Sequence, residues 1–460
     1  MRSNLVGSGG SFHKIRCFRV FPGYPPLPYL DLVAVISVCA LFVLIELIEV
    51  KIPHNAWYED KPFTLTFPDT WKVHKCKVPS EDAKPLTPEQ IKAAIHNPYG
   101  QKPLEKLAEN AEEVVIIFDD MTRPTKTYQY APHILETLHK AGVPKDNIRF
   151  IISPGTHGTY GRIDFVKKLG DDIVSEYQVY NHNPYDILDH LGETSYGTPV
   201  YINSEVMACD LKIGIGTVLF HRLTGYSGGG KMISPGVAGM KTIKYNHGDI
   251  GGFGPGLTPC KTTGYLSNDN NRMRLDMEET ARMAGLDYKI DTVLNLQRDP
   301  IELYAGDFVE TQRRAAKGTK KWHTIDNPVA DIAVAGAYMR ENEPYLSRWP
   351  LYNSVKDDGT IVMFNDDPNG DINHWLFNRH GKEVGACLWN PVVGKLARGA
   401  RMIIFGDYPL KSFMMRYDPE QVTWIRKWDE VIEELKTHHG KESTVTVIPD
   451  GTSNIPANLL

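Results

Sequence analysis

The sequence has few cysteines for its length, and none of them stand at paired spacings. Its six cysteines are scattered through 460 residues, at Cys17, Cys39, Cys76, Cys209, Cys260 and Cys387. This scatter is typical of a reducing compartment and argues against a disulfide framework. The CxxC and HExxH patterns are also absent, so an ordinary zinc site is not expected. The formal net charge of −5 leaves no basic surplus, which excludes nucleic acid as a partner.

The sequence also lacks an apolar run of the roughly 20 residues that a membrane-spanning helix needs. The candidate segment, residues 32–45, holds 14 uncharged apolar residues after a basic stretch. This length suits a signal peptide, but no small-residue cleavage site follows it. Two interpretations of residues 1–46 stay open: an extension outside the fold, for example from an upstream start codon, or a membrane anchor or export signal. The rest of the chain is predicted to be cytoplasmic.

Three apolar segments lead directly into polar residues that can carry chemistry. Residues 114–118 form a continuous apolar run rich in β-branched side chains, which predicts a buried parallel strand. Residues 148–152 and 211–215 are mostly apolar and are predicted to be strands as well. In an open α/β sheet, ligands bind at the carboxyl ends of such strands. We therefore expect the residues that follow the three strands to line one crevice: Asp120, Arg123, His157, His221 and Lys231.

The segment from His221 to Lys231 reads HRLTGYSGGGK and is the most informative part of the chain. Three consecutive glycines allow backbone N–H groups to close on an anion such as a phosphate. The spacing from Gly225 to Lys231 matches most of a P-loop, but Met232 stands where an NTPase needs a hydroxyl for Mg²⁺. A phosphate- or nucleotide-binding module, ATPase-like or non-catalytic, is kept as the alternative function.

Together the motifs resemble the nickel-dependent lactate racemase family of 2-hydroxyacid racemases and epimerases. The resemblance rests on DDMTRP (119–124), GTH (155–157), HRLTGYSGGGK (221–231) and His247, and it extends over roughly residues 47–460. It implies a nickel pincer nucleotide, a pyridinium-3-thioamide-5-thiocarboxylic acid mononucleotide, that is covalently attached at Lys231. It also implies that His247 is the nickel ligand and that cofactor-maturation enzymes are partners.

The chemistry that the resemblance implies starts from the poorly acidic C2–H bond of a 2-hydroxyacid. If this hydrogen leaves as hydride, the planar 2-keto acid can take it back on either face. His157 and His221 are predicted to exchange the hydroxyl proton, because imidazole titrates near neutral pH. Arg123 is predicted to bind the carboxylate or the keto oxygen through its forked donors. Asp120 is predicted to orient Arg123 or a histidine, and a turn-capping role is the equal alternative.

Further contacts to the cofactor and the substrate are expected from two segments. The cofactor is predicted to contact Tyr226, Ser227, Gly228, Gly229 and Gly230, although a core position suits Tyr226 equally well. Lactate racemases of the family carry a Gln and a Lys, and our alignment places Leu346 and Trp349 there. Arg348 is predicted to supply the missing charge, and the predicted substrate contacts are Arg123, Tyr345, Arg348 and Trp349. We therefore expect a 2-hydroxyacid with a larger side chain than lactate, either aromatic or branched.

The expected fold is α/β, with two domains of mainly parallel sheets and the active site in the interdomain cleft at strand carboxyl ends. Residues 47–305 are predicted to bind the cofactor, residues 306–440 to close over the substrate, and residues 441–460 to return to the first domain. Helices are expected after the N-cap Thr87 and at residues 419–439, and the acidic turn at 366–371 is interpreted as solvated. Racemase or epimerase, and monomer or homo-oligomer, stay open.

Overall fold

The first of two six-stranded sheets contains the three predicted strands at its centre. Its strand order is β14-β13-β9-β4-β5-β6, and all neighbours are parallel except β13 and β14. The bounds in this order are Pro300–Gly306, Tyr288–Leu294, Leu211–Thr217, Val114–Asp119, Ile148–Ser153 and Gln178–Asn181. The apolar runs at β4 and β9 are buried along their whole length, as expected of central strands covered on both faces.

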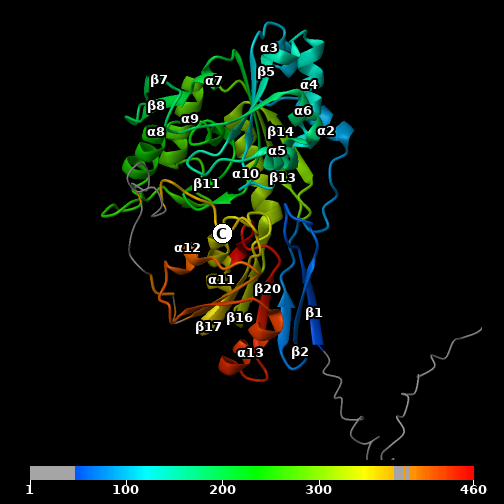
Figure 1. Ribbon diagram of the computed structural model, residues 1–460, viewed down its shortest axis with the longest axis vertical. Coiled ribbons are helices and arrows are strands. Elements are labelled where there is room, and N and C mark those ends of the chain that lie inside the picture. The colour runs from blue at the N-terminus through cyan, green and yellow to red at the C-terminus, as the bar shows by residue number, and fades with distance from the viewer. Residues whose placement is uncertain (1–46, 378–387, 389–393, 397, 399, 460) are drawn as a thin grey trace, which may run out of the picture. The chain divides into compact units, whose positions relative to one another are not determined.

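The second sheet is parallel throughout and has the order β19-β18-β17-β16-β20-β3. Its strands are Val422–Ile425, Arg401–Phe405, Val355–Phe364, Ala330–Gly336, Thr444–Ile448 and Lys72–Lys75. The first sheet occupies the upper half of Figure 1 and the second sheet the lower half. The predicted class, α/β with two mainly parallel sheets, is therefore what the chain forms.

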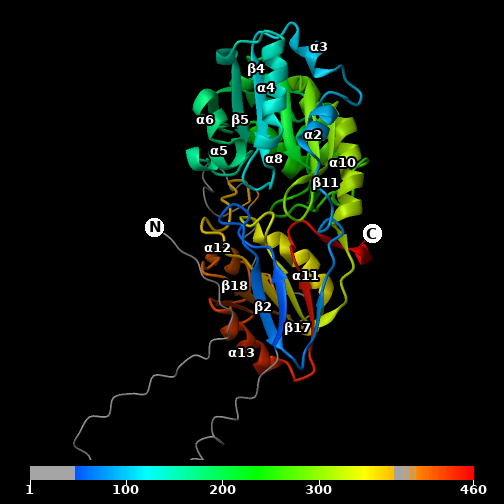
Figure 2. The same ribbon diagram turned by 90° about the vertical axis from the view of Figure 1, so that its right-hand side faces the viewer.

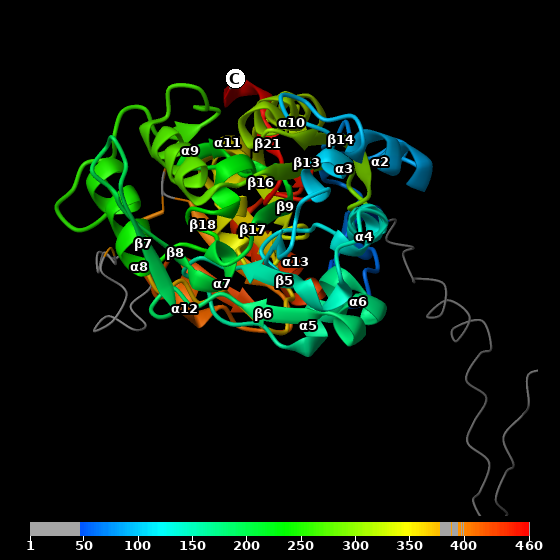
Figure 3. The ribbon, with the colours of Figure 1, turned by 90° about the horizontal axis from the view of Figure 1, so that it is seen from above.

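Helices cover both faces of the first sheet, as the view from above shows (Figure 3). On one face lie α2 (Pro88–Ile95), α3 (Leu104–Ala108), α4 (Ala131–Lys140), α5 (Arg162–Leu169) and α6 (Asp171–Glu176). The other face packs against α7 (Ser204–Met207), α8 (Met240–Tyr245), α9 (Arg272–Ala284) and the start of α10 (Phe308–His323). This burial leaves the strand ends as the place where polar side chains can gather.

The N-terminal strands belong to the second sheet's half of the molecule. The hairpin of β1 (Leu47–Ile52) and β2 (Phe63–Pro68) packs with α13 (Trp428–His438) on one face of this sheet, and β3 pairs with β20 at its edge (Figures 1 and 2). The other face is covered by α11 (Arg348–Ser354) and α12 (Lys411–Met414). The predicted domain boundaries at 47–305 and 441–460 therefore do not follow the two sheets, because β3 and β20 pair with each other in the second sheet.

The remaining strands form small sheets beside these two. They are β7 (Leu188–Glu193) with β8 (Pro199–Asn203), the trio β10 (Phe220–His221), β11 (Thr224–Tyr226) and β12 (Gly264–Tyr265), and β15 (Thr324–Ile325) with β21 (Ile455–Pro456). The β10–β11 hairpin matters most for function, because it carries His221 into the glycine segment.

Local signals located some helix ends well and others poorly. Thr87 caps α2 in a reciprocal capping box with Gln90, as predicted. The helix expected at 419–439 is wrong at its start, because Val422–Ile425 forms the edge strand β19 and the helix begins at Trp428. β-branched and aromatic residues there pair with β18, and Asp418 caps a turn at Glu420 instead. The turn at 366–371 is not simply solvated, because Asp367 is buried.

The computed structural model describes residues 47–377, 388, 394–396, 398 and 400–459, and Leu47–Leu460 form one compact unit. The apolar segment 32–45 lies outside the described residues, so its two interpretations stay open. Among the residues that are described, no helix has the length and apolar character needed to cross a membrane.

Candidate active site

The carboxyl ends of the two sheets meet at a cavity of about 550 Å³. The first sheet supplies the residues that follow β4, β5 and β9, and the second supplies the segments that follow β16 and β17. Predicted residues that line the cavity are Asp120, Arg123, His157, His221, Ser227, Gly228, Lys231, His247, Tyr345 and Arg348. The volume lies in the range that enclosed small-molecule sites usually have.

Asp120 and His157 form a hydrogen-bonded pair at the ends of β4 and β5. Oδ2 of Asp120 lies 2.6 Å from Nδ1 of His157 and also accepts a hydrogen bond from the Tyr160 hydroxyl at 3.0 Å. Burial favours the neutral acid, but His157 and then Arg123 hold the pKa of Asp120 below its usual value. A carboxylate at Nδ1 keeps the proton on that nitrogen, so Nε2 of His157 is left as a free base.

The loop that carries Asp120 is held by a buried lysine on α5. Nζ of Lys168 donates to Oδ1 of Asp119 at 2.6 Å and to the carbonyl oxygens of Asp120 and Arg123 at 3.2 and 3.0 Å. The second oxygen of Asp119 accepts from the Thr217 backbone N–H at the end of β9. This pattern explains why two adjacent aspartates are needed: one fixes the loop and the other serves the cavity.

His221 presents a different face to the cavity from His157. Its Nδ1 accepts hydrogen bonds from the backbone N–H groups of Leu223 and Thr224, each at 3.2 Å. An acceptor nitrogen carries no proton, so neutral His221 has its proton on Nε2. Burial lowers the pKa of His221 well below its usual value, and Lys231 and Arg123 add to this effect. The two predicted bases are therefore opposite tautomers.

Lys231 and His247 line the same cavity. In the described part of the chain, no hydrogen bond or ion pair involves the Lys231 amine, and burial together with the charge of Arg274 holds its pKa well below the usual value. His247 lies in a π-helical turn, Asn246–Ile250, and its Nδ1 is 2.9 Å from the carbonyl oxygen of Ile243. Its Nε2 is thereby left as the available ligand atom. The preceding helix, α8, begins at Met240.

The glycine segment is packed more tightly than a phosphate cradle requires. The N–H of Gly229 donates to the Asp291 carboxylate, at 3.1 Å to Oδ2. A Cβ atom at Gly228 would lie 2.4 Å from Val218, and one at Gly229 would lie 2.8 Å from Gln312. Here the glycines are needed for close packing and for the positive φ of Gly228 and Gly229.

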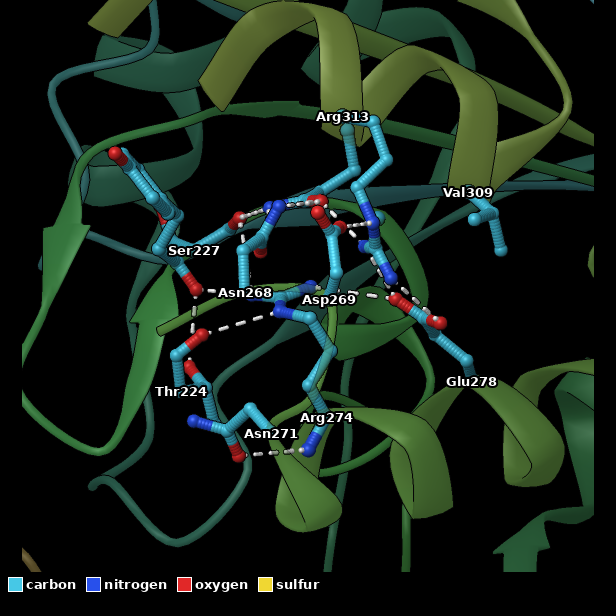
Figure 4. A network of polar contacts seen from close by, with 12 residues as sticks. Thr224, Ser227, Asn268, Asp269, Asn271, Arg274, Glu278, Val309 and Arg313 are labelled. Carbon is cyan, nitrogen blue, oxygen red and sulfur yellow. Dashed lines mark hydrogen bonds and ion pairs between the residues drawn. The ribbon is translucent and has the colours of Figure 1, made fainter. Parts of the chain in front are cut away.

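A buried arginine on α9 holds the carbonyl groups of this segment, as Figure 4 shows. Arg274 donates from Nε to the Thr224 carbonyl oxygen at 3.1 Å and from Nη2 to the Tyr226 carbonyl oxygen. The Ser227 hydroxyl donates to the Thr217 carbonyl oxygen and accepts from the Leu219 N–H. Ser227 therefore already uses its hydroxyl to shape the loop, and its predicted contact to the cofactor stays a prediction.

The second sheet contributes an ion-pair network that the sequence analysis missed. Glu343 accepts from Nη1 of Arg123 at 3.2 Å, from Nε of Arg340 at 2.9 Å and from the Tyr345 hydroxyl at 2.8 Å. Burial alone would raise its pKa, but the two arginines lower it to about 2. The signal was available, because residues 338–343 follow β16 directly, just as Asp120 follows β4.

His374 is a second residue that the sequence analysis missed. Its ring meets that of His157 edge to face, with centroids 5.1 Å apart, and Nδ1 lies 3.3 Å from the Thr156 hydroxyl oxygen. The backbone N–H of Trp375 donates to the Thr156 carbonyl oxygen. No local motif marks His374, because only the docking of the two halves places it beside His157.

Four predicted site residues do not line the cavity: Tyr226, Gly229, Gly230 and Trp349. Tyr226 is buried and packs on Phe220, which is the core position considered as its alternative. Trp349 is 42% exposed and stacks on Tyr265, because the first turn of α11 directs it away from Tyr345 and Arg348. Within the described ranges, no three His, Cys, Asp or Glu side chains are grouped so that they could hold a metal ion.

Comparisons with known proteins agree with this arrangement. Residues 58–252 match the family model of the lactate racemase N-terminal domain. The chain is 27% identical to the lactate racemase of Lactiplantibacillus plantarum over 393 residues, which cover 79% of this chain and 89% of the relative. It is 26% identical to the lactate racemase of Thermoanaerobacterium thermosaccharolyticum over 395 residues, with the same coverage. The chain is therefore similar to lactate racemases over most of its length, and the resemblance predicted from its motifs is confirmed.

Solved structures bear on the fold. The lactate racemase apoprotein from Thermoanaerobacterium thermosaccharolyticum superposes with a TM-score of 0.66 at 22% identity, covering 89% of this chain and all of that one. A Thermotoga maritima protein superposes with a TM-score of 0.56 at 19% identity, covering 81% of this chain and 99% of that one. The predicted fold class is confirmed. The names of the curated relatives agree with the predicted enzyme class, a lactate racemase-like isomerase.

Proposed function

We propose that the chain interconverts stereoisomers of a 2-hydroxyacid with a nickel pincer nucleotide attached at Lys231. The observation that carries this proposal is the meeting of Lys231, His247 and the Asp120–His157 pair at one cavity between the two sheets. The relatives named lactate racemase support a racemase activity in general. Three further features belong to our proposal alone: hydride transfer, the cofactor and the larger side chain of the substrate.

The residues present fit this cofactor. Lys231 is partly exposed, and its amine has no partner in the described residues. Its lowered pKa favours the neutral, nucleophilic form that an amide-type linkage requires. His247 has Nδ1 committed to a backbone carbonyl oxygen, which is the usual second hydrogen bond of a metal-bound imidazole. One histidine is a sufficient protein ligand when a cofactor supplies the other donor atoms. The chemistry supplied by the bound cofactor is reversible acceptance of hydride from C2.

The residues of the chain bind the substrate and move its hydroxyl proton. Arg123 offers its guanidinium to the carboxylate or the developing keto oxygen, while Glu343 and Thr122 hold it in position. Nε2 of His157 takes the hydroxyl proton, and Asp120 stabilises the resulting imidazolium through Nδ1. Residues from both halves of the molecule line the cavity and so limit the access of water.

His221 is assigned a different part from the one expected of it. Because its Nδ1 is occupied by two backbone N–H groups, neutral His221 can offer Nε2–H to a substrate oxygen but cannot take a proton there. We therefore assign His221 as a donor that stabilises the keto oxygen, and His157 as the base. The larger side chain expected of the substrate is part of the proposal, with Tyr345 and Leu346 on the cavity wall.

The test is peptide mass spectrometry across Lys231, with nickel analysis, on protein produced together with cofactor-maturation enzymes. We expect a nucleotide-sized adduct on Lys231, bound nickel and racemisation of at least one 2-hydroxyacid. Lys231→Ala should lose the adduct and the activity, whereas Lys241→Ala on the outer surface of α8 should keep both. A bare Lys231 without nickel, under conditions that mature a known relative, would favour the phosphate-binding alternative.

A further inference from the structure

The cavity wall carries more positive than negative side chains. Its basic residues are Arg123, Arg222, Lys231, Arg340, Arg348 and Arg416, and its acidic residues are Asp119, Asp120, Glu343 and Asp371. A buried cation is costly unless an anion accompanies it. The charges that are not paired within the protein therefore indicate the charge of the ligand that the cavity binds.

Three of the four carboxylates are already balanced within the protein. Those of the first half are bonded to Lys168 and His157, as described above. Glu343 accepts from both Arg123 and Arg340. These ion pairs involve neither Arg222 nor Arg348.

The fourth carboxylate, Asp371, lies in the field of Arg416. It accepts a hydrogen bond from the Ser412 hydroxyl at 3.2 Å. Burial raises the pKa of Asp371 to about 6, against the opposing charge of Arg416. With Asp371 assigned to Arg416, and with Lys231 proposed to carry the cofactor, Arg222 and Arg348 are the basic residues of the wall that are left to account for.

Arg348 is held by neutral groups. Its Nε donates to the Tyr345 carbonyl oxygen at 3.1 Å, and its Nη1 donates to the Tyr417 hydroxyl. The rings of Phe413 and Tyr417 lie 5.8 and 5.5 Å from the guanidinium carbon. Among the described residues, no carboxylate forms an ion pair with it. Aromatic and carbonyl contacts fix the orientation of the guanidinium but do not neutralise its charge.

Arg222 lies near Arg348, next to the predicted catalytic residue His221. It is exposed and makes no hydrogen bond or ion pair within the part of the chain that the structure describes. Its charge acts on Arg348 and, after burial, helps to lower the pKa of that guanidinium. Two like charges at one wall repel each other, so this arrangement is most stable with an anion between them.

We propose that Arg222 and Arg348 form a second anion-binding site, and that the substrate is a 2-hydroxyacid with a terminal carboxylate on its side chain. This inference rests on the proposed function, in which Arg123 takes the carboxylate next to the reacting carbon. The larger side chain, which the sequence predicted to be aromatic or branched, is then an anionic one. Forked guanidinium donors match a carboxylate with two parallel hydrogen bonds.

The first experiment compares two acids that differ only in the terminal group. Holoenzyme is incubated with 2-hydroxypentanedioate or 2-hydroxypentanoate, and racemisation is followed by chiral chromatography. We expect kcat/KM to be about 10- to 100-fold higher for the dicarboxylate, which is the usual effect of a charge-assisted hydrogen bond. Equal or higher kcat/KM for the monocarboxylate overturns the inference, and so does a preference for 2-hydroxy-3-phosphopropanoate over both.

The second experiment assigns the effect to the two arginines. Arg348→Gln should reduce kcat/KM for the dicarboxylate about 10- to 100-fold and change that for the monocarboxylate less than about 3-fold. Arg222→Gln tests the same point at an exposed position, where the fold is not at risk. Arg426→Gln, in a surface pair with Asp407, is the matched control. Equal losses on both acids would mean that Arg348 binds the carboxylate common to both, which overturns the inference.

Calorimetric titration provides a readout that does not depend on turnover. Unmodified protein should bind 2-hydroxypentanedioate more tightly than 2-hydroxypentanoate, and Arg348→Gln should abolish that difference. The two proposals fail in distinguishable ways. If nickel-loaded protein racemises only monocarboxylates, the anion site is wrong and the proposed function stands; if it racemises none of the acids, the proposed function itself is wrong.

Discussion

At the scale of single residues, the site depends on which nitrogen of each histidine is already occupied. His157 gives Nδ1 to Asp120, whereas His221 and His247 have Nδ1 bonded to backbone groups. In each case the local bond fixes the tautomer and leaves Nε2 for the cavity. These three states are the basis of the different roles that we propose for the three histidines: a base, a donor and a metal ligand.

Asp120→Asn tests the first of these assignments. The amide removes the charge that stabilises imidazolium at His157 and can also present a donor to Nδ1, which favours the wrong tautomer. We expect kcat to fall roughly 10²- to 10⁴-fold, as in comparable carboxylate–histidine pairs, with little change in KM. Steady-state kinetics on the best 2-hydroxyacid substrate measure both constants.

Tyr160→Phe is the milder comparison at the same carboxylate oxygen. It removes one neutral hydrogen bond, so kcat should fall only about 2- to 10-fold. If Asp120→Asn raised KM and left kcat unchanged, Asp120 would act in substrate binding and its positioning role would be wrong.

At the scale of elements, short segments after strands do most of the work, and their packing is specific. The glycine segment lies against α9 and α10, so that a side chain at Gly229 meets Gln312 and the Phe308 carbonyl oxygen. Gly142, in the turn after α4, has a similar positive φ but open space around it. Alanine substitutions at Gly229 and Gly142 therefore separate the cost of the backbone conformation from the cost of the steric clash.

Gly229→Ala should lower the free energy of unfolding by about 2–5 kcal/mol, and Gly142→Ala by about 1–2 kcal/mol. Both variants place alanine at positive φ, but only the first also overpacks a buried interface. Urea unfolding followed by circular dichroism measures the difference. Equal losses would show that the loop can shift, and that tight packing is not why glycine is needed at Gly229.

A second element-scale feature joins three neighbouring strands inside the second sheet. Asp331 on β16 accepts hydrogen bonds from the Thr444 backbone N–H and hydroxyl on β20 and from Lys356 on β17, at 2.9, 2.6 and 2.8 Å. Burial opposes ionisation, but these donors lower the pKa of Asp331 to about 2. Its contribution to stability is therefore present above the unfolded value of about 4 and is lost as the pH falls through about 2.

Asp331→Asn should lower the free energy of unfolding at pH 7 by about 1 kcal/mol, a figure reduced for the 31% exposure of the side chain. The difference from the native protein should shrink by about half at pH 3, because the unfolded carboxyl is then mostly protonated. Urea titrations at both pH values test this. Asp69→Asn, at an exposed turn, should show neither effect. A difference that grows towards pH 3 would contradict the assignment.

At the scale of the whole molecule, two sheets with their carboxyl ends facing each other create a site that neither half contains alone. Arg298, on the loop between β13 and β14, helps to join the halves. It donates to Asp60 at 2.8 Å and to the Tyr338 hydroxyl at 3.3 Å, and its guanidinium lies over the Trp57 ring. The Arg298 side chain is nearly inaccessible, whereas Asp60 is 40% exposed, so solvent screens the ion pair in part.

Arg298→Met should lower the free energy of unfolding by about 2–3 kcal/mol and also reduce kcat/KM, because the position of Glu343 against Arg123 depends on the same interface. Arg162→Met, which breaks an exposed pair with Asp171, should cost less than about 1 kcal/mol and leave kcat/KM unchanged. Thermal unfolding and kinetics on the two variants decide this. Unchanged kinetics in Arg298→Met would show that the halves are positioned by other contacts.

The sequence by itself determined the central strands and the chemistry that follows them. Apolar segments and the turn residues after them depend only on neighbours in the chain, so β4, β5 and β9 were predicted correctly, and Asp120, His157 and Lys231 line one cavity as expected. The start of α13 was misplaced because the pairing of β19 with β18 outweighs helix signals that are only local.

Only the tertiary structure decided which groups face one another across the cavity. It removed Trp349 from the wall and brought His374 to His157. It also assigned β3 to the second sheet and left Arg348 without a carboxylate in the described residues. These outcomes depend on which surfaces far apart in the chain are buried together, and no local pattern encodes that choice.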